Sequence, residues 1–152
     1  MNILGIIMTR RIFNKILDDA IKDEQYSYEL YTRAVKKTKL KIAKNLLRQL
    51  ADQELFHKQK LEEMRGNKTK LKTEKLSTLK PEELMLTPIT EFRDLQEIIK
   101  FAIKKEVAAK KRYNQLAKTV DSEEARKLLS FLEKEEKHHA ELLRELKKEL
   151  SI

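Results

Sequence analysis

A Glu-x-x-His pattern occurs twice in this chain, and each copy follows another glutamate at the same interval. The six residues are Glu24, Glu54 and His57 in the first half, and Glu106, Glu136 and His139 in the second. The differences 54 − 24 and 136 − 106 both equal 30 residues. Side chains three residues apart share one face of a helix, so the Glu and His of each pattern can reach one ligand. Carboxylates and imidazoles in this arrangement indicate metal binding.

Apolar residues flank these six positions, which predicts that their side chains point into a helical core. Glu24, for example, lies three residues after Ile21 and four before Tyr28. Four buried carboxylates would repel one another strongly unless cations neutralised them. Two divalent cations would balance the four negative charges, and neutral imidazoles would add none. For Glu24 and Glu106, the alternative is a partly exposed glutamate paired with a nearby lysine.

One glutamate from each of two helices, with Glu-x-x-His from each of the other two, is the ligand set of di-iron and di-manganese bundles. The spacing therefore predicts a dinuclear metal centre. In this centre Glu54 and Glu136 would bridge the two ions, His57 and His139 would each bind one ion, and Glu24 and Glu106 would be terminal ligands.

The chain also matches itself when it is shifted by 82 residues. Residues 20–24 then fall on 102–106, and Tyr31 falls on Tyr113. Such a repeat indicates a duplicated structural unit. Here the unit is a helical hairpin, and two hairpins related by pseudo-twofold symmetry would close a bundle.

Only four residues are strong helix breakers, namely Gly5, Gly66, Pro81 and Pro88. Between them, apolar residues at i, i+3, i+4 and i+7 predict helices at about 12–37 and 41–65, near Asp94 onward, and after residues 121–124. We therefore expect an all-α four-helix bundle made of two helical hairpins joined by one long crossover. The expected boundaries are an N-terminal extension at 1–11, a hairpin at 12–65, the crossover at 66–90 and a hairpin at 91–149. Within the crossover, residues 81–84 are predicted to form a short helical turn.

The composition narrows the class of protein. The chain has 152 residues, of which 40% are hydrophobic, enough for one packed domain. With 2 Gly and 2 Pro, it lacks the turn residues that an all-β fold needs. It has no Cys, which excludes disulfides, a cysteine nucleophile and an iron site held by thiolates.

The formal net charge of +9 is spread along the chain and interleaved with glutamate. This pattern favours solvated helix faces over a nucleic-acid surface. No stretch approaches the ~18 apolar residues of a membrane span. The apolar residues 1–8 precede Arg10 and Arg11, whereas a secretory signal places its basic residues first. We therefore expect a cytoplasmic protein, with Met8 as an alternative start.

Tyr31 and Tyr113 lie two turns along the same helix faces as Glu24 and Glu106. A phenol at either position can donate a hydrogen bond to a ligand carboxylate, and plain core packing is the alternative. His138 points about 100° away from its neighbour around the helix. It is therefore predicted to be a surface residue rather than a ligand.

These residues and spacings make the chain resemble the rubrerythrin branch of the ferritin-like superfamily over residues 12–149. The resemblance implies two iron ions, with manganese or a mixed pair as alternatives, whose reduced form reacts with hydrogen peroxide or dioxygen. Relatives with peroxidase activity receive electrons through a rubredoxin-like Cys₄ iron domain. This sequence has no cysteine, so that iron site is absent and the resemblance implies a separate electron-donor protein. It also implies a homodimer, in which the 66–90 crossover could pass between subunits.

Two other functions stay open. The symmetric set of six ligands is closer to bacterioferritin, which implies ferroxidation that feeds iron storage. Bacterioferritins bind haem through a methionine beside a ligand glutamate, and Leu55 stands at that position, so no haem is expected. The contrasting class is a non-catalytic helical interaction module, in which buried polar groups only fix how the helices pair.

Overall fold

Four long helices make up most of the computed structural model, which describes residues 3–72 and 79–152. They are α1 (Ile3–Val35), α2 (Lys41–Gly66), α3 (Leu95–Thr119) and α4 (Glu123–Glu149). Short turns join α1 to α2 and α3 to α4, so each half of the chain is a helical hairpin. The predicted all-α four-helix bundle with one long crossover is confirmed. The domain boundaries at residues 12 and 149 stay a prediction.

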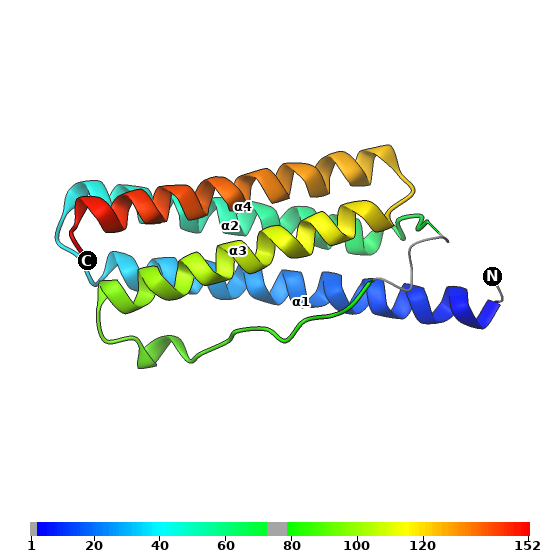
Figure 1. Ribbon diagram of the computed structural model, residues 1–152, viewed down its shortest axis with the longest axis horizontal. Coiled ribbons are helices and arrows are strands. Elements are labelled where there is room, and N and C mark those ends of the chain that lie inside the picture. Colours follow the sequence, from blue (N-terminus) through cyan, green and yellow to red (C-terminus); the bar gives the residue numbers. More distant parts are fainter. Residues whose placement is uncertain (1–2, 73–78) are drawn as a thin grey trace.

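The two hairpins pack side by side, and the N-terminal end of α1 extends beyond them (Figure 1). Within them, α1 packs on α2 and α3 packs on α4, while α1 also contacts α3 and α2 contacts α4. From residue 79 the crossover runs beside α1 to the opposite end of the bundle, where α3 begins (Figure 1). This arrangement turns one face of every helix toward a shared interior.

The helix starts follow local capping chemistry. Asp94 accepts a hydrogen bond from the backbone N–H of Glu97 at 2.9 Å, and Ser122 accepts one from Ala125 at 3.3 Å. These side chains satisfy amide groups that the first turn of a helix leaves unpaired. The start of α3 beside Asp94 and the start of α4 after Asp121–Ser122 therefore agree with the sequence prediction.

The start of α1 differs from the prediction, because the helix begins at Ile3 rather than near residue 12. Residues 3–11 of the expected extension therefore continue α1, and Gly5 lies inside the helix. A glycine in a helix interior costs only about 1 kcal/mol, which neighbouring helix formers can outweigh. Five hydrophobic side chains of this segment are exposed, namely Ile3, Leu4, Ile6, Ile7 and Met8.

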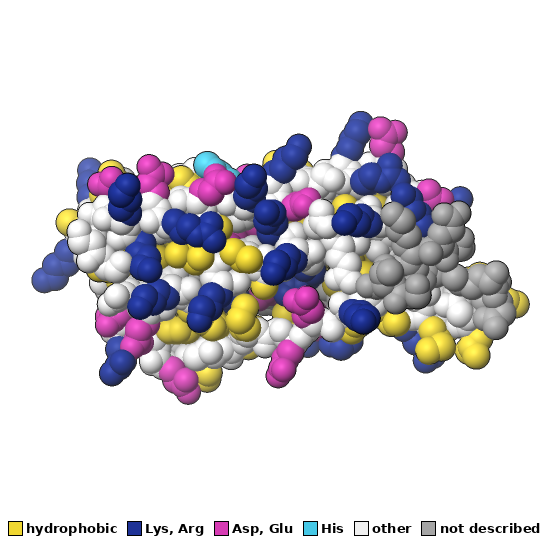
Figure 2. All heavy atoms as spheres, viewed as in Figure 1, with side chains coloured by type: hydrophobic (Ala, Val, Ile, Leu, Met, Phe, Trp, Pro, Cys, Tyr) yellow, Lys and Arg dark blue, Asp and Glu magenta, His cyan; other side chains and the backbone are white. Residues whose placement is uncertain are grey.

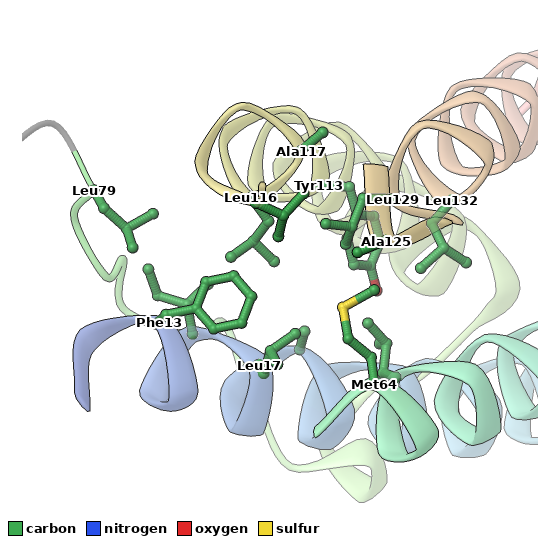
Figure 3. Packing of buried hydrophobic residues seen from close by; sticks show 14 of the residues in the cluster. Phe13, Leu17, Met64, Leu79, Tyr113, Leu116, Ala117, Ala125, Leu129 and Leu132 are labelled. Atoms are coloured by element: carbon green, nitrogen blue, oxygen red, sulfur yellow. The ribbon is translucent and has the colours of Figure 1, made fainter. Parts of the chain in front are cut away.

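Two hydrophobic clusters fill the bundle, one toward each end. The first includes Phe13, Leu17, Leu116 and Leu129, and Leu79 of the crossover packs into it (Figure 3). The second collects residues from the other end of the helices, such as Leu30, Leu47, Ile99 and Leu143. The six predicted ligands lie between the two clusters along every helix, so an apolar layer closes the site on both sides.

The crossover is held to the bundle by side chains. Tyr26 donates a hydrogen bond to the carbonyl oxygen of Thr87, and Lys105 donates one to that of Met85 at 2.8 Å. The predicted helical turn at 81–84 is wrong, because the crossover has no regular secondary structure at 81–88 and a 3₁₀ turn forms instead at Ile89–Glu91. Residues 73–78 of the predicted crossover lie outside the described residues.

Lysine and arginine side chains are scattered over the visible face, with acidic side chains among them (Figure 2). This distribution is typical of solvated helix faces and agrees with the charge pattern of the sequence. Among the described residues, none of the helices is long and apolar enough to span a lipid bilayer.

Candidate metal centre

The six predicted ligands are all buried at the middle of the bundle. Each of the four glutamates is at most 2% exposed, and both histidines are 0% exposed. Every helix contributes: α1 and α3 each supply one glutamate, and α2 and α4 each supply a Glu-x-x-His pair. The alternative for Glu24 and Glu106, a partly exposed glutamate beside a lysine, is therefore wrong.

The polar atoms of these residues fall into two overlapping groups. Glu24, Glu54, His57 and Glu136 form one group, and Glu54, Glu106, Glu136 and His139 form the other. In each group, one candidate ligand atom from every residue lies within 4.8 Å of the others. Glu54 and Glu136 belong to both groups, which is the position that bridging carboxylates would occupy.

Both histidines turn the Nδ1 atom toward the carboxylates. Nδ1 of His57 lies 3.0 Å from Oε1 of Glu136 and 3.6 Å from Oε2 of Glu24. Nδ1 of His139 lies 2.9 Å from Oε1 of Glu54 and 3.6 Å from Oε2 of Glu106. The two rings stack with centroids 5.6 Å apart. In both histidines, Nδ1 is therefore the atom that faces the carboxylates.

The site leaves buried polar atoms without hydrogen-bond partners, which tests whether metal ions fit it. The atoms are Oε2 of Glu24 and Glu106, Oε1 of Glu54 and Glu136, Nδ1 of His57 and His139, and Nε2 of His57. An unpaired buried polar atom is costly, and native proteins rarely keep several together. All seven atoms belong to the six predicted ligands, and every one of these residues contributes at least one. The donor set therefore fits two cations.

The pKa values of the buried groups also favour bound cations at this site. Burial and the charges of Glu106 and Glu136 raise the pKa of Glu54 well above 4.5. Burial and the charges of Glu106 and Glu24 likewise raise the pKa of Glu136. Burial would lower the pKa of His57, but the carboxylates of Glu24, Glu135 and Glu106 together outweigh it and raise the pKa above 6.5. Positive charge is thus favoured at this point of the core.

Two tyrosines hold the terminal glutamates. Tyr31 of α1 donates a hydrogen bond to Oε1 of Glu106 on α3, and Tyr113 of α3 donates one to Oε1 of Glu24 on α1. Each bond leaves the other carboxylate oxygen, Oε2, free and directed at the site. Burial and the adjacent glutamate raise the pKa of both phenols well above 10, so each phenol keeps its proton.

Two contacts on the outer side of the histidines have no counterpart in the sequence prediction. Nε2 of His139 lies 2.8 Å from Oε1 of Gln53, and Nε2 of His57 lies 3.6 Å from Oε1 of Glu135. Gln53 and Glu135 occupy the same position of the 82-residue repeat, directly before a ligand glutamate. That shared position was the available sequence signal. His138 is exposed, as predicted, and lies 4.0 Å from Glu141.

A buried ion pair beside the site was also missed. Lys105 of α3 pairs with Asp23 of α1, and Arg112 adds a second contact to Asp23 at 3.0 Å. Lys105 also lies over the ring of Tyr26, with its Nζ atom 4.5 Å from the ring centroid. Asp23 and Lys105 are again repeat counterparts, 82 residues apart, so the pair joins the two hairpins where their symmetry axis passes.

The fold and the buried carboxylate–histidine cluster place the chain among four-helix bundles with a candidate dinuclear metal centre. The sequence model of the rubrerythrin family matches residues 15–147. The chain therefore belongs to the rubrerythrin family.

A solved structure, a hypothetical protein from Pyrococcus furiosus, is similar to this one with a TM-score of 0.71 and 22% sequence identity. The match covers 90% of this chain and 88% of that chain. At this identity the likeness supports the fold alone. No curated protein matches the sequence.

Proposed function

We propose that the chain holds two iron ions and reduces hydrogen peroxide or dioxygen with electrons from a separate donor protein. The observation that carries this proposal is the set of unpaired buried atoms, one from each of six residues, in two groups that share Glu54 and Glu136. Membership of the rubrerythrin family supports iron over other divalent metals. Two bound iron ions would supply two electrons through their change from Fe(II) to Fe(III).

The residues of the chain have separate parts in this proposal. Glu54 and Glu136 would be shared by the two ions, and His57 and His139 would each bind one ion through Nδ1. Tyr31 and Tyr113 fix the orientation of the terminal glutamates and keep the phenolic proton next to the site. The two apolar clusters keep bulk water away from both ends of the site.

Metal analysis of protein purified without oxygen is the first test. The proposal requires about two iron ions per chain, the stoichiometry of this ligand set. The reduced protein should then consume hydrogen peroxide and become oxidised, with one peroxide used for every two iron ions. A chain that binds no metal under these conditions would leave only a helical interaction module.

A second candidate is ferroxidation that feeds iron storage. The observation in its favour is the symmetry of the six ligands across the two hairpins, because Ala109 and Lys110 stand where some rubrerythrins place a further carboxylate. Addition of excess Fe(II) in air distinguishes the two functions. A storage protein would accumulate many iron ions per chain, whereas the peroxide-reducing protein would keep about two.

A further inference from the structure

The outer nitrogen of each histidine faces a different kind of group. Nε2 of His139 meets the neutral amide of Gln53 at 2.8 Å, whereas Nε2 of His57 faces the carboxylate of Glu135 at 3.6 Å. The sequence shows the same difference, because residues 53 and 135 are counterparts in the 82-residue repeat but differ in type. The six predicted ligands are the same residue types in both halves of the chain. The difference between Gln53 and Glu135 therefore breaks the symmetry of the centre.

The chemical consequence depends on which histidine nitrogen binds metal. Nδ1 of both rings faces the carboxylate groups, so a metal ion there leaves Nε2 to carry the proton. A negative charge near that N–H favours its proton there and raises the basicity of the ring as a ligand. A carboxylate does this more strongly than an amide, because it carries a full negative charge.

The distance and burial of Glu135 suit this action. At 3.6 Å the contact is an ion-pair separation rather than a hydrogen bond, but the field of a net charge reaches further than that of an amide dipole. The Glu135 side chain is 24% exposed, so water screens its charge only in part. Phe131 meets the ring of His57 edge to face, with centroids 6.4 Å apart, while its repeat counterpart is Gln49.

We infer that the two metal positions are unequal, and that Glu135 makes the position at Glu24 and His57 the one that binds a divalent cation first. This inference rests on the proposed dinuclear centre. Glu135 is a positioning residue in this scheme, because it acts on the cation through His57. Removal of such a group behind a metal-binding histidine lowers metal affinity about 10–100-fold, so a preference of about tenfold between the two positions is expected.

The test is to load metal-free protein with one equivalent of cobalt(II) and to measure the cobalt at each position by anomalous scattering from crystals. In the natural sequence the position at His57 should hold about ten times more cobalt than the position at His139. Glu135→Gln should bring the two occupancies close to equal. The exchange variant, with Glu135→Gln and Gln53→Glu together, should reverse the preference.

The control is Glu141→Gln, which removes an exposed carboxylate from the same helix and should leave the ratio unchanged. Thermal unfolding of each metal-free variant checks that it folds. Equal occupancy in the natural sequence, or a preference that the exchange does not reverse, would overturn the inference while leaving the dinuclear centre intact. Absence of cobalt from both positions would instead refute the proposed metal centre.

Discussion

Tyr113 of α3 donates a hydrogen bond to Glu24 of α1, so a residue of one hairpin orients a predicted metal ligand of the other. Tyr31 and Glu106 repeat the contact in the opposite direction. Each tyrosine binds one carboxylate oxygen and leaves the second one directed at the site. The same two hydrogen bonds therefore join the hairpins and orient two of the predicted ligands.

Replacing Tyr113 with phenylalanine should weaken metal binding without unfolding the bundle. The substitution removes only a hydroxyl, so packing is kept, but Glu24 loses the donor that fixes its orientation. Loss of such a contact typically lowers metal affinity by about tenfold or more. Titration of the metal-free protein with cobalt(II), followed by visible absorption, measures the change. Tyr28→Phe is the matched control, because Tyr28 lies one turn from Glu24 and makes no hydrogen bond to it among the described residues. Equal effects of the two variants would contradict the role of Tyr113.

Replacing Glu54 with glutamine should empty both metal positions. Glu54 belongs to both groups of candidate ligands, and a neutral amide removes one of the four negative charges that balance the cations. We expect metal content to fall from about two ions per chain to well below one. Elemental analysis of protein purified without oxygen gives this number. The control, Glu62→Gln, removes a charge from the exposed side of the same helix and should keep about two metal ions per chain. Retention of both ions in the Glu54 variant would refute the bridging assignment.

The sequence predicted the helices and the convergence of polar residues because both follow from periodicity. Helix α2 begins at Lys41 as expected, and the 82-residue repeat placed the four glutamates at equivalent depths. The prediction began α1 near residue 12, whereas the helix starts at Ile3 and passes through Gly5, because a single glycine does not stop a helix whose neighbours favour it. The predicted turn at residues 81–84 also failed. Side chains distant in sequence, Tyr26 and Lys105, bind the carbonyl groups of the crossover just after these residues.

The residues behind the site were harder to find. Gln53 and Glu135 are polar residues in a chain that is 39% charged, so their types carry no signal by themselves. Their role depends on which helix stands opposite, because Gln53 of α2 contacts His139 of α4 and Glu135 of α4 contacts His57 of α2. Periodicity within one helix does not contain that information.

Replacing Lys105 with methionine should destabilise the protein by about 3 kcal/mol, because Asp23 would keep its buried charge and lose one of its two partners. Arg112 stays in contact with Asp23, which keeps the loss at the lower end of the usual range. The variant also frees the carbonyl of Met85, so the crossover should become easier to cleave by protease. Urea unfolding measures the stability. Lys104→Met, at an exposed neighbouring position, should change it by less than about 0.5 kcal/mol, and a similar change in both variants would contradict this prediction.

The metal-free protein should lose stability as the pH rises. Burial and nearby carboxylates raise the folded-state pKa of Glu54 and Glu136 above the ordinary value of 4.5. A group with a raised folded pKa stabilises the fold fully below its unfolded pKa, and this contribution is lost as the pH rises through the folded value. His57 acts in the same direction from 6.5 upward, because burial is outweighed by the charges of Glu24, Glu135 and Glu106, which together raise its pKa. The three groups therefore all favour the fold at acidic pH.

Surface charges also change with pH, so the measurement has to be a difference between two proteins. Melting temperatures of the metal-free natural sequence and of the double variant Glu54→Gln, Glu136→Gln should be compared between about pH 5 and pH 8. The natural sequence should lose melting temperature relative to the variant across this interval, because only it has to ionise two buried carboxylates. Metal-loaded protein should lack this loss, since bound cations take the place of the protons. Parallel curves for the two metal-free proteins would show that these carboxylates do not control stability.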